Sequence, residues 1–282
     1  DLRSLDGPQL ADGIYSLLQL VRAAGAPTTV WAVTRGARAV ELAERAKLDV
    51  AAAAIWGLGA ALATEHGDVW GGCLDLDPAA SAAAAAKMLF DHLCAGQRGD
   101  AALRGARRLQ PKLRRAPMPG AVVAPSVFRA DASYLVTGGL SGVGLQIARW
   151  MVSQGARRLV IFGRTPLPER VHWRESDAPA VAAVRSLEAM GASVIYGVID
   201  VSDETALAPW LSDYAAQSWP AIRGVVHAAG VSNERLAVDM DMAATAAVLA
   251  GKVHGALNLD RLLPDLDFFM LFSSVASYLG LP

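Results

Sequence analysis

The stretch "YLVTGGLSGVGLQIARW", residues 134–150, decides the fold. It connects an apolar β-rich run, residues 134–136, to an amphipathic segment with helical spacing through a glycine-rich turn. Glycine tolerates the backbone conformations that a tight strand-to-helix turn needs, and its missing Cβ lets the backbone approach a ligand closely. A helix that begins there presents free N–H groups and the positive end of its dipole. The segment therefore predicts a βαβ unit that binds the pyrophosphate of a dinucleotide.

The predicted phosphate-binding loop is the segment between that strand and that helix. It consists of Thr137, Gly138, Gly139, Leu140, Ser141, Gly142, Val143 and Gly144. The alternative is a glycine-rich turn that holds no ligand. We favour the binding loop, because a strand before the glycines and a helix after them is the context that this function requires.

The end of the next predicted strand indicates which dinucleotide binds. An NAD site carries an acid for the ribose 2′-hydroxyl about twenty residues after the last glycine. Here the strand ends in "VIFGRTP", with Gly163, Arg164 and Thr165 and no acid. An arginine at this point would pair with a 2′-phosphate, which favours NADPH over NADH. The alternative for Arg164 is a solvated surface side chain.

Two further strand ends carry candidate cofactor contacts. Asp200, followed by Val201 in "VIDVSD", could accept a hydrogen bond from the adenine amino group, or it could cap a helix, or both. The next strand ends in "HAAG", that is His227, Ala228, Ala229 and Gly230. Small residues there would let a flat ribose–nicotinamide lie close, although plain tight packing is the alternative.

Strands and helices alternate along the whole chain. Unalternated apolar strands separated by helical segments predict an α/β fold with a parallel sheet that helices cover on both faces. The composition loosens around "PMPGAVVAPS", so we place a domain boundary there, with one domain at residues 1–125 and a second at residues 126–282. Residues 242–263 are predicted to form one long helix, and the basic "ARRLQPKLRRAPMPG" is predicted to be extended.

Composition narrows the class of protein. The 282 residues are 53% hydrophobic and 19% charged with a net charge of −1, which fits a folded chain and gives no electrostatic case for nucleic acid or an anionic membrane. Two cysteines, Cys73 and Cys94, form neither a disulfide framework nor a metal site, so a reducing cytoplasm is expected. The remaining histidines show no metal-ligand spacing, and we expect no metal. No run is long enough for a transmembrane helix, and the start is not a signal peptide.

The motifs together resemble a known family. The pattern T-G-x-x-x-G-x-G at residues 137–144, with Asp200 and "HAAG", resembles the short-chain dehydrogenase/reductases. Within them, "IRGVVHAAGV", "GKVHGALNLD" and "FFMLFSSVAS" resemble the ketoreductase domains of polyketide synthases, with the vertebrate-type fatty acid synthase reductase as a near neighbour. In the first half, "AAIWGLGAALATEHGDVWGGCLDLD" and "RRLQPKLRRAP" resemble the structural subdomain of those ketoreductases. The resemblance implies two Rossmann-like subdomains, the second a doubly wound parallel sheet with an NADP(H) site, the first a shortened, cofactor-free version.

The resemblance also implies a reaction. A β-ketoacyl thioester on an acyl carrier protein accepts hydride from NADPH at C3, and its oxygen is protonated by a tyrosine. A serine donates a hydrogen bond to the carbonyl, and a lysine and an asparagine support the proton relay. Lys252 matches the family's lysine and Ser274, the second of a pair with Ser273, matches its serine. The alternatives are a solvated helix lysine and ordinary strand-end hydrogen bonding.

The family's tyrosine has no counterpart in the sequence. Tyr278 is four residues past Ser274, too close for that role, and we interpret it as a loop or packing aromatic. We expect the chain to be part of a larger multienzyme, cut at both ends and lying beside neighbouring domains, and by itself inactive in ketone reduction. A reduction-inactive structural or epimerising domain is the main alternative. A free-standing dehydrogenase of small alcohols is disfavoured, because the first half has no role there.

The product configuration stays open at this stage. One class of these reductases carries Leu-Asp-Asp after "HAAGV", where this chain has Ser232, Asn233 and Glu234. The other class carries a tryptophan shortly before the tyrosine, near the position of Leu279. Neither marker is met, and the acid at 234 favours the first class.

Overall fold

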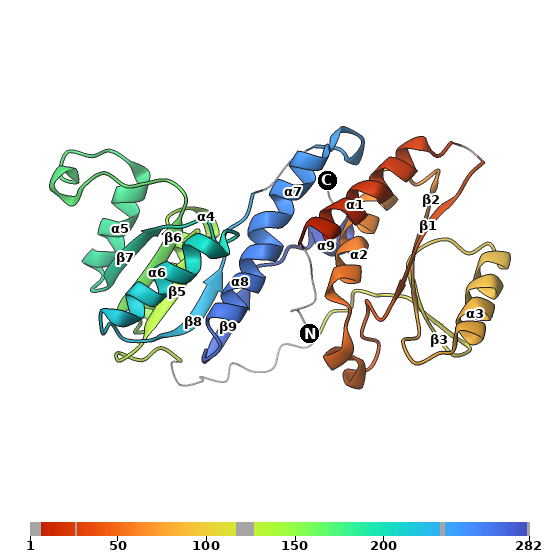
Figure 1. Cartoon of the computed structure of the whole chain (residues 1–282), viewed down its shortest axis with the longest axis horizontal. Helices are drawn as coiled ribbons and strands as arrows, with labels where there is room; N and C mark the ends of the chain where they lie inside the picture. Colours follow the sequence, from red (N-terminus) through yellow and green to blue (C-terminus); the bar gives the residue numbers. More distant parts are fainter. Residues whose placement is uncertain (1–6, 26, 117–126, 232–234, 281–282) are drawn as a thin grey trace. The chain divides into compact units, whose positions relative to one another are not determined.

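The computed structural model describes residues 7–25, 27–116, 127–231 and 235–280. The chain forms two compact units, which are described separately here (Figure 1). The first unit contains Asp1–Met118 together with Asn233–Ala246 and Ser273–Pro282, and the second contains Pro119–Ser232 and Ala247–Phe272. The boundary predicted at 125/126 lies outside the described residues and stays a prediction.

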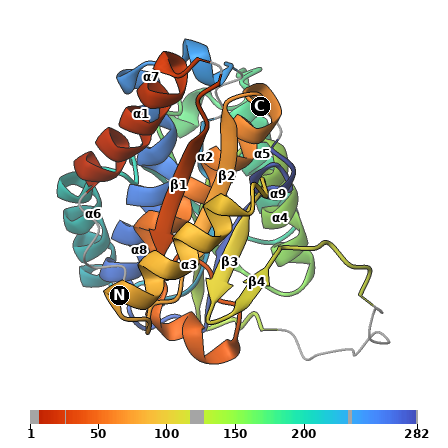
Figure 2. The same ribbon diagram turned by 90° about the vertical axis from the view of Figure 1, so that its right-hand side faces the viewer.

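The first unit is a four-stranded sheet with helices on both faces (Figure 2). Its strands, in the order β1-β2-β3-β4, are β1 (Val30–Arg35), β2 (Trp70–Leu76), β3 (Ala101–Arg104) and β4 (Arg107–Leu109). The first three are parallel, and β4 pairs antiparallel with β3. The helices are α1 (Gly7–Ala23), α2 (Val50–Glu65), α3 (Ala82–Cys94) and α9 (Ala276–Leu279), with short 3₁₀ turns η2 (Leu42–Lys47) and η4 (Ala237–Asp239).

The core of the first unit lies under α1 and α2. Leu18 of α1 and Trp56 and Leu62 of α2 pack on Ala32 and Cys73 of the sheet. Helix α3 contacts the other face, where the ring of His92 meets the Trp31 ring edge-on at 5.3 Å between centroids. Asp49 and Ser81 cap α2 and α3 by accepting from the Ala52 and Ala84 backbone N–H groups, as polar residues directly before a helix commonly do.

The second unit is a five-stranded, fully parallel sheet in the order β7-β6-β5-β8-β9. Its strands are β5 (Ser133–Thr137), β6 (Arg158–Gly163), β7 (Ser193–Val198), β8 (Ile222–His227) and β9 (Phe268–Leu271). Its helices are α4 (Gly142–Ser153), α5 (Pro179–Ala189), α6 (Glu204–Ala216), the last turn of α7 (Met242–Leu249), the π-helical turn η5 (Ala250–His254) and α8 (Gly255–Leu262), with the 3₁₀ turn η3 (Arg170–His172). The strand order reverses beside β5, which is where doubly wound folds bind nucleotides.

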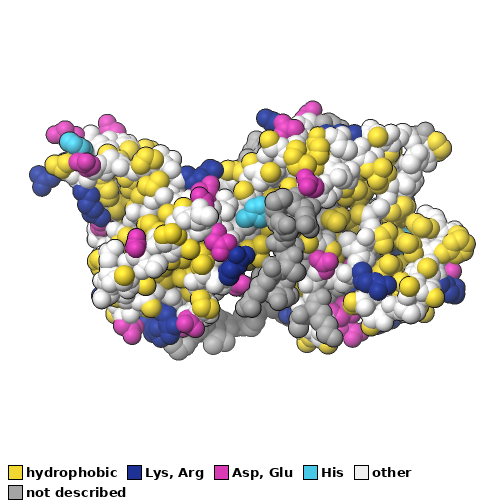
Figure 3. Space-filling view, in the orientation of Figure 1, with side chains coloured by type: hydrophobic (Ala, Val, Ile, Leu, Met, Phe, Trp, Pro, Cys, Tyr) yellow, Lys and Arg dark blue, Asp and Glu magenta, His cyan; other side chains and the backbone are white. Residues whose placement is uncertain are grey.

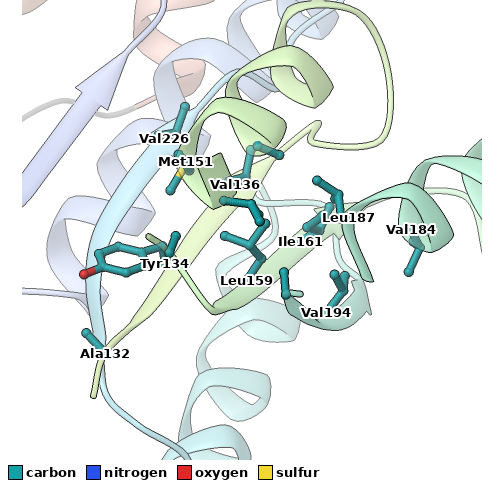
Figure 4. Close-up of a cluster of buried hydrophobic side chains, with 14 of the residues drawn as sticks. Ala132, Tyr134, Val136, Met151, Leu159, Ile161, Val184, Leu187, Val194 and Val226 are labelled. Carbon is teal, nitrogen blue, oxygen red and sulfur yellow. The ribbon is translucent and has the colours of Figure 1, made fainter. Parts of the chain in front are cut away.

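Two apolar layers hold that sheet. On one face, α4 and α5 cover Tyr134, Val136 and Ile161, with Met151 and Leu187 as helix partners (Figure 4). The other face is a separate cluster: Leu135, Val160, Phe162, Val225, Leu207 of α6 and Leu259 of α8. Because both faces of each central strand are buried, the strands are continuously apolar rather than alternating.

The predicted fold class is confirmed: the chain is α/β with parallel sheets. The structure adds detail to two local predictions. The described part of the basic stretch predicted as extended is free of helix, and its first residues, Arg107–Leu109, form β4, which pairs antiparallel with β3. The helix predicted over residues 242–263 is present as a helical segment without a gap over residues 242–262, but it contains the π-turn η5, in which the Gly255 N–H bonds the carbonyl of Ala250, five residues back.

Candidate active site

A cleft of about 630 Å³ opens at the carboxyl ends of the central strands of the second unit. It is bounded by the loop from β5 to α4, the ends of β6, β7 and β8, and the helix before η5. Its lining residues are Thr137, Gly138, Ser141, Gly142, Val143, Gly144, Phe162, Gly163, Arg164, Ile199, Asp200, Val201, Ala228, Ala229, Gly230, Val231, Ala247, Ala250 and Gly251. Most of the predicted cofactor residues therefore line one cleft. The others are next to lining residues in the sequence but are not part of the lining: Gly139, Leu140, Thr165 and His227.

Three glycines of the loop have no room for a side chain. A Cβ on Gly144 would lie 2.3 Å from the Gly138 carbonyl oxygen, and one on Gly139 would lie 2.9 Å from Val136. Gly138 has a φ of +69° and faces the backbone of Ala229. The start of α4 is therefore folded tightly onto the end of β5, a geometry that glycine alone permits.

The N-terminus of α4 faces the cleft with its N–H groups available. Ser141 is the N-cap residue, but its side chain makes no capping hydrogen bond, and the first turn of the helix carries no acid. The free N–H groups and the positive end of the helix dipole together favour an anion. The residues present therefore fit a bound pyrophosphate.

Arg164 follows β6 at the rim of the cleft, and Gly163 precedes it. The guanidinium is exposed and, within the described part of the chain, forms no ion pair. The adjacent Tyr196 donates a hydrogen bond to the Thr165 carbonyl at 2.7 Å, and its hydroxyl would lie 2.4 Å from a Cβ on Gly163. Burial raises the pKa of Tyr196, so its hydroxyl keeps its proton and stays a donor. Arg164 is thus left available for a ligand anion.

Asp200 does not cap the following helix. Its carboxylate accepts hydrogen bonds from the backbone N–H and the hydroxyl of Ser202, at 3.0 and 2.6 Å, so it forms a local turn. Asp203 caps α6 instead, accepting from Thr205 and Ala206 N–H groups. The helix-cap interpretation of Asp200 was wrong, and its carboxylate stands at the cleft.

Asn258 is a contributor to the site that sequence reasoning missed. Its buried side-chain amide donates to the carbonyls of Val201 and Ser202, at 3.0 and 3.1 Å. It therefore fixes the loop after β7 from a helix that lies more than fifty residues later in the chain. A polar residue within "GKVHGALNLD" was the only available signal.

The "HAAG" segment forms a polar network rather than plain apolar packing. His227 is 4% exposed; its Nδ1 lies 2.8 Å from the Thr137 hydroxyl, and its Nε2 lies 2.9 Å from the Gly251 carbonyl. The same hydroxyl accepts from the backbone N–H of Ala229 at 3.0 Å. The network connects the ends of β5 and β8 to η5.

Lys252 is exposed on η5 in the second unit, and its methylene groups lie over Gly230, where a Cβ would be 3.0 Å from Cε. Ser274 belongs to the first unit, where its hydroxyl accepts from the N–H of Ala276 at 3.1 Å and is exposed. Tyr278 lies in α9 and is 40% exposed. Ser232, Asn233 and Glu234, at the positions of the Leu-Asp-Asp marker, lie outside the described residues.

The surface and the other titratable groups add little to the site. Among the described residues, no cluster of histidine, cysteine and acid side chains is suited to a metal ion, and no described helix has the length and apolar character for crossing a bilayer. Cys73 and Cys94 are free thiols, the first buried and the second exposed. On the face in Figure 3, acidic and basic side chains are interspersed rather than gathered into one basic patch.

A doubly wound parallel sheet with a cleft beside a glycine loop is typical of dinucleotide-binding proteins, and the comparison with known proteins narrows this class to one family. Residues 132–282 match the KR domain family, so the chain belongs to the ketoreductase domains of polyketide synthases. It is 42% identical over 257 residues to the 5-methyl-1-naphthoate synthase of Streptomyces sahachiroi, which covers 87% of this chain and 14% of that protein. It is 38% identical over 239 residues to the 6-methylsalicylic acid synthase of Penicillium terrestre, covering 81% of this chain and 13% of that protein.

Solved structures show the same family. The ketoreductase from the first module of phoslactomycin biosynthesis in Streptomyces sp. HK803 superposes with a TM-score of 0.81 at 34% identity, over 94% of this chain and 60% of that one. An A-type ketoreductase from a modular polyketide synthase gives 0.80 at 32% identity, over 96% of this chain and 56% of that one. The chain thus spans a small part of its curated relatives and just over half of these structural neighbours.

Proposed function

We propose that the second unit binds NADPH in the cleft and that the chain takes part in reducing a β-ketoacyl thioester, presented by an acyl carrier protein, to the β-hydroxyacyl thioester. The observation that carries the proposal is the cleft itself. There a glycine loop without room for side chains, a helix N-terminus without a side-chain cap and Arg164, which has no ion pair among the described residues, line the same cleft. Membership of the ketoreductase family supports the reaction class.

The residues of this chain have distinct parts in binding. The backbone N–H groups at residues 142–144 would hold the pyrophosphate, and Arg164 would pair with the 2′-phosphate through charge-assisted hydrogen bonds. Asp200 would accept from the adenine amino group, and Ala228 to Gly230 would support the ribose–nicotinamide end. When bound, the cofactor supplies the hydride.

The proton side of the reaction depends on a lysine and a serine. The ammonium group of Lys252 favours the ionised form of a neighbouring acid, which lowers that acid's pKa and eases proton transfer. The Ser274 hydroxyl would donate to the substrate carbonyl as negative charge develops on its oxygen. Both side chains are exposed, which leaves them accessible to a substrate.

Calorimetric titration of the 282-residue chain with NADPH and with NADH tests the cofactor assignment. We expect NADPH to bind about tenfold or more tightly than NADH, and Arg164→Gln to remove about that preference while NADH binding stays unchanged. Arg174→Gln, at another exposed arginine of the same unit, is the matched control and should change neither affinity. Equal affinity for the two cofactors, or no binding by the folded chain, would refute the assignment.

The reduction is tested in the synthase that contains this chain. With a β-ketoacyl group on the acyl carrier protein, NADPH absorbance should fall in proportion to the β-hydroxyacyl product, and Lys252→Ala should slow that loss by about a hundredfold or more. NADPH binding without any reduction by the intact synthase would favour the structural or epimerising alternative.

A further inference from the structure

The buried side chain of His227 has no direct role in the proposed function, yet it contacts the segment that carries Lys252. The Gly251 carbonyl can only accept a hydrogen bond, so the His227 Nε2, 2.9 Å away, must carry the proton. In a neutral ring Nδ1 is then an acceptor, and the Thr137 hydroxyl donates to it at 2.8 Å. Because that hydroxyl also accepts from Ala229, every member of the network is satisfied in one protonation state.

The π-turn explains why the Gly251 carbonyl needs this partner. In a regular α-helix the N–H of Gly255 would bond the carbonyl of Gly251, four residues back. Here it bonds the carbonyl of Ala250 instead, so Gly251 loses its α-helical donor. His227 supplies a replacement from the end of β8. Short π-turns are costly insertions in a helix and are frequent at functional sites.

Gly255, after the π-turn, packs so closely against the end of β7 and the His227 ring that a side chain would not fit without movement. A Cβ on Gly255 would lie 2.6 Å from Val201 Cγ2 and 3.3 Å from Cε1 of His227. One turn earlier, Gly251 lies in ordinary van der Waals range of Gly230, since a Cβ there would be 3.7 Å from the Gly230 Cα, over which the methylene groups of Lys252 extend. The helix backbone is therefore held against the strand ends at the turn that carries the lysine (between α7 and α8 in Figure 1).

We propose that His227 is a positioning residue: its hydrogen bond to the Gly251 carbonyl holds the π-turn η5 against the end of β8 and so places Lys252 at the edge of the cleft. The inference deepens the proposed function and rests on it for the role of the lysine, whereas the tether itself does not depend on cofactor binding. Burial lowers the pKa of His227, which keeps the ring in the neutral form that the network uses.

Two substitutions separate the two hydrogen bonds of the ring. In His227→Gln the terminal amide can reach as far as Nε2 and can still donate to Gly251. In His227→Asn the shorter side chain can still accept from Thr137 but cannot reach Gly251. A merely space-filling role would make the two variants similar, whereas the tether predicts that only the asparagine variant releases η5.

Hydrogen exchange of the cofactor-free chain measures that release. We expect amides of residues 251–256 to exchange about tenfold or more faster in His227→Asn, with little change in β5 and β8, and less than about threefold faster in His227→Gln. His92→Gln, at a buried histidine of the first unit, is the control and should leave these amides unchanged. Equal effects of the two His227 variants, or a uniform rise across the strands, would overturn the proposal.

A second variant protects the test if His227→Asn does not fold. Gly255→Ala places a Cβ 2.6 Å from Val201 Cγ2 and 3.3 Å from Cε1 of His227, so the helix must move back from the end of β7 and from the ring while His227 itself is unchanged, and the same local acceleration is expected. No acceleration at residues 251–256 in a folded Gly255→Ala would also overturn the proposal.

Acylation of Lys252, measured by peptide mass spectrometry, tests the consequence for the lysine. With NADPH bound, labelling should slow several-fold in the unmodified chain and in His227→Gln, and should stay at the cofactor-free rate in His227→Asn. If NADPH binds but does not protect Lys252 in the unmodified chain, the proposed place of the lysine in the site fails, while hydrogen exchange still decides the tether.

Discussion

The two sheets of this chain are alike at the carboxyl ends of their parallel strands, but one sheet has a cleft there and the other has buried side-chain charges. In both, a buried threonine near the end of the first strand bonds a polar side chain at the end of the neighbouring strand: Thr34 to Asp75 at 2.8 Å in the first unit, and Thr137 to His227 at 2.8 Å in the second. In the second unit the space beyond is a cleft. In the first unit the corresponding space at the strand ends is occupied by the charged side chains of Asp75 and Arg104.

The negative charge at the strand ends of the first unit is the fully buried carboxylate of Asp75. It accepts from the backbone N–H groups of Ala37 and Arg38, in the loop after β1, at 2.8 and 3.3 Å. The guanidinium of Arg104 donates to it at 2.8 Å and also pairs with Glu44 at 3.1 Å. The loop N–H groups that could bind an external anion in such a fold are therefore used by an internal one.

The difference shows that a Rossmann-like edge is a place for negative charge, whether the charge comes from a ligand or from the chain. A glycine-rich loop leaves the place open to a ligand. A buried aspartate with an arginine partner closes it and turns it into a structural element.

Removing the internal anion should have the largest effect. Asp75→Ala leaves two loop N–H groups without their acceptor and leaves the buried Arg104 cation with Glu44 as its one remaining carboxylate partner among the described residues, so the first unit should lose about 3–5 kcal/mol of unfolding free energy. The loss is measured by urea unfolding, with the reactivity of the buried Cys73 thiol as the signal for unfolding of the first unit. Asp91→Ala removes the exposed Lys87 pair and should change stability by less than about 1 kcal/mol.

Added formate sharpens the same experiment. A small carboxylate fits the space that the Asp75 side chain leaves, so formate should raise the urea midpoint of Asp75→Ala and not that of the unmodified chain. The same midpoint shift in both proteins would mean that formate acts through bulk solvent, and the anion site would not be as described.

Closing the open edge should have the next largest effect. In Gly144→Ala the new Cβ would meet the Gly138 carbonyl at 2.3 Å, so the loop must move, and NADPH affinity should fall by about a hundredfold. Gly57→Ala in α2 meets no atom within 4 Å and should leave binding intact while stabilising the helix by up to about 1 kcal/mol. Unchanged affinity in Gly144→Ala would exclude this loop from the binding site.

Acid should weaken the closed edge through Glu44. The hydrogen bond from Arg104 lowers the pKa of Glu44 below its ordinary 4.5, so its stabilising contribution is complete above that pH and is lost as the pH falls through the lowered value. The stability difference between the unmodified chain and Glu44→Gln should therefore be constant above about pH 5 and shrink below about pH 4. A difference that stays constant from pH 5 down to the lowest pH at which the chain remains folded would contradict the pairing.

The smallest effect is expected at the surface thiol. Cys94 is exposed and should react with a thiol reagent in the native chain, with no change in NADPH affinity. Burial raises the pKa of the Cys73 thiol, so Cys73 should react only when the first unit unfolds. Rapid reaction of both thiols in the native chain would mean that the first unit is not closed.

Much of the second unit was predictable because its signals are local. Gly139 and Gly144 are needed by contacts with Val136 and Gly138, a few residues away in the chain, and the apolar strands reflect burial on both faces. The π-turn at residues 250–254 and the β3–β4 hairpin were not predicted, since each depends on a partner that sequence periodicity does not reveal. The helix-cap interpretation of Asp200 was wrong, because Asp203 lies only three residues later and also suits that role, and it is Asp203 that caps α6.

The α/β class, the predicted phosphate loop and the candidacy of Arg164 followed from the sequence, because these depend on residue type and on spacing along the chain, whereas Lys252 and Ser274 became candidates through the family resemblance. Tertiary structure alone decided that Asp75 is satisfied by Arg104, 29 positions away, that His227 bonds Thr137, 90 positions away, and that Asn258 holds the loop after β7. Buried polar groups must find partners, but sequence does not say which of many candidates the fold brings within hydrogen-bond distance.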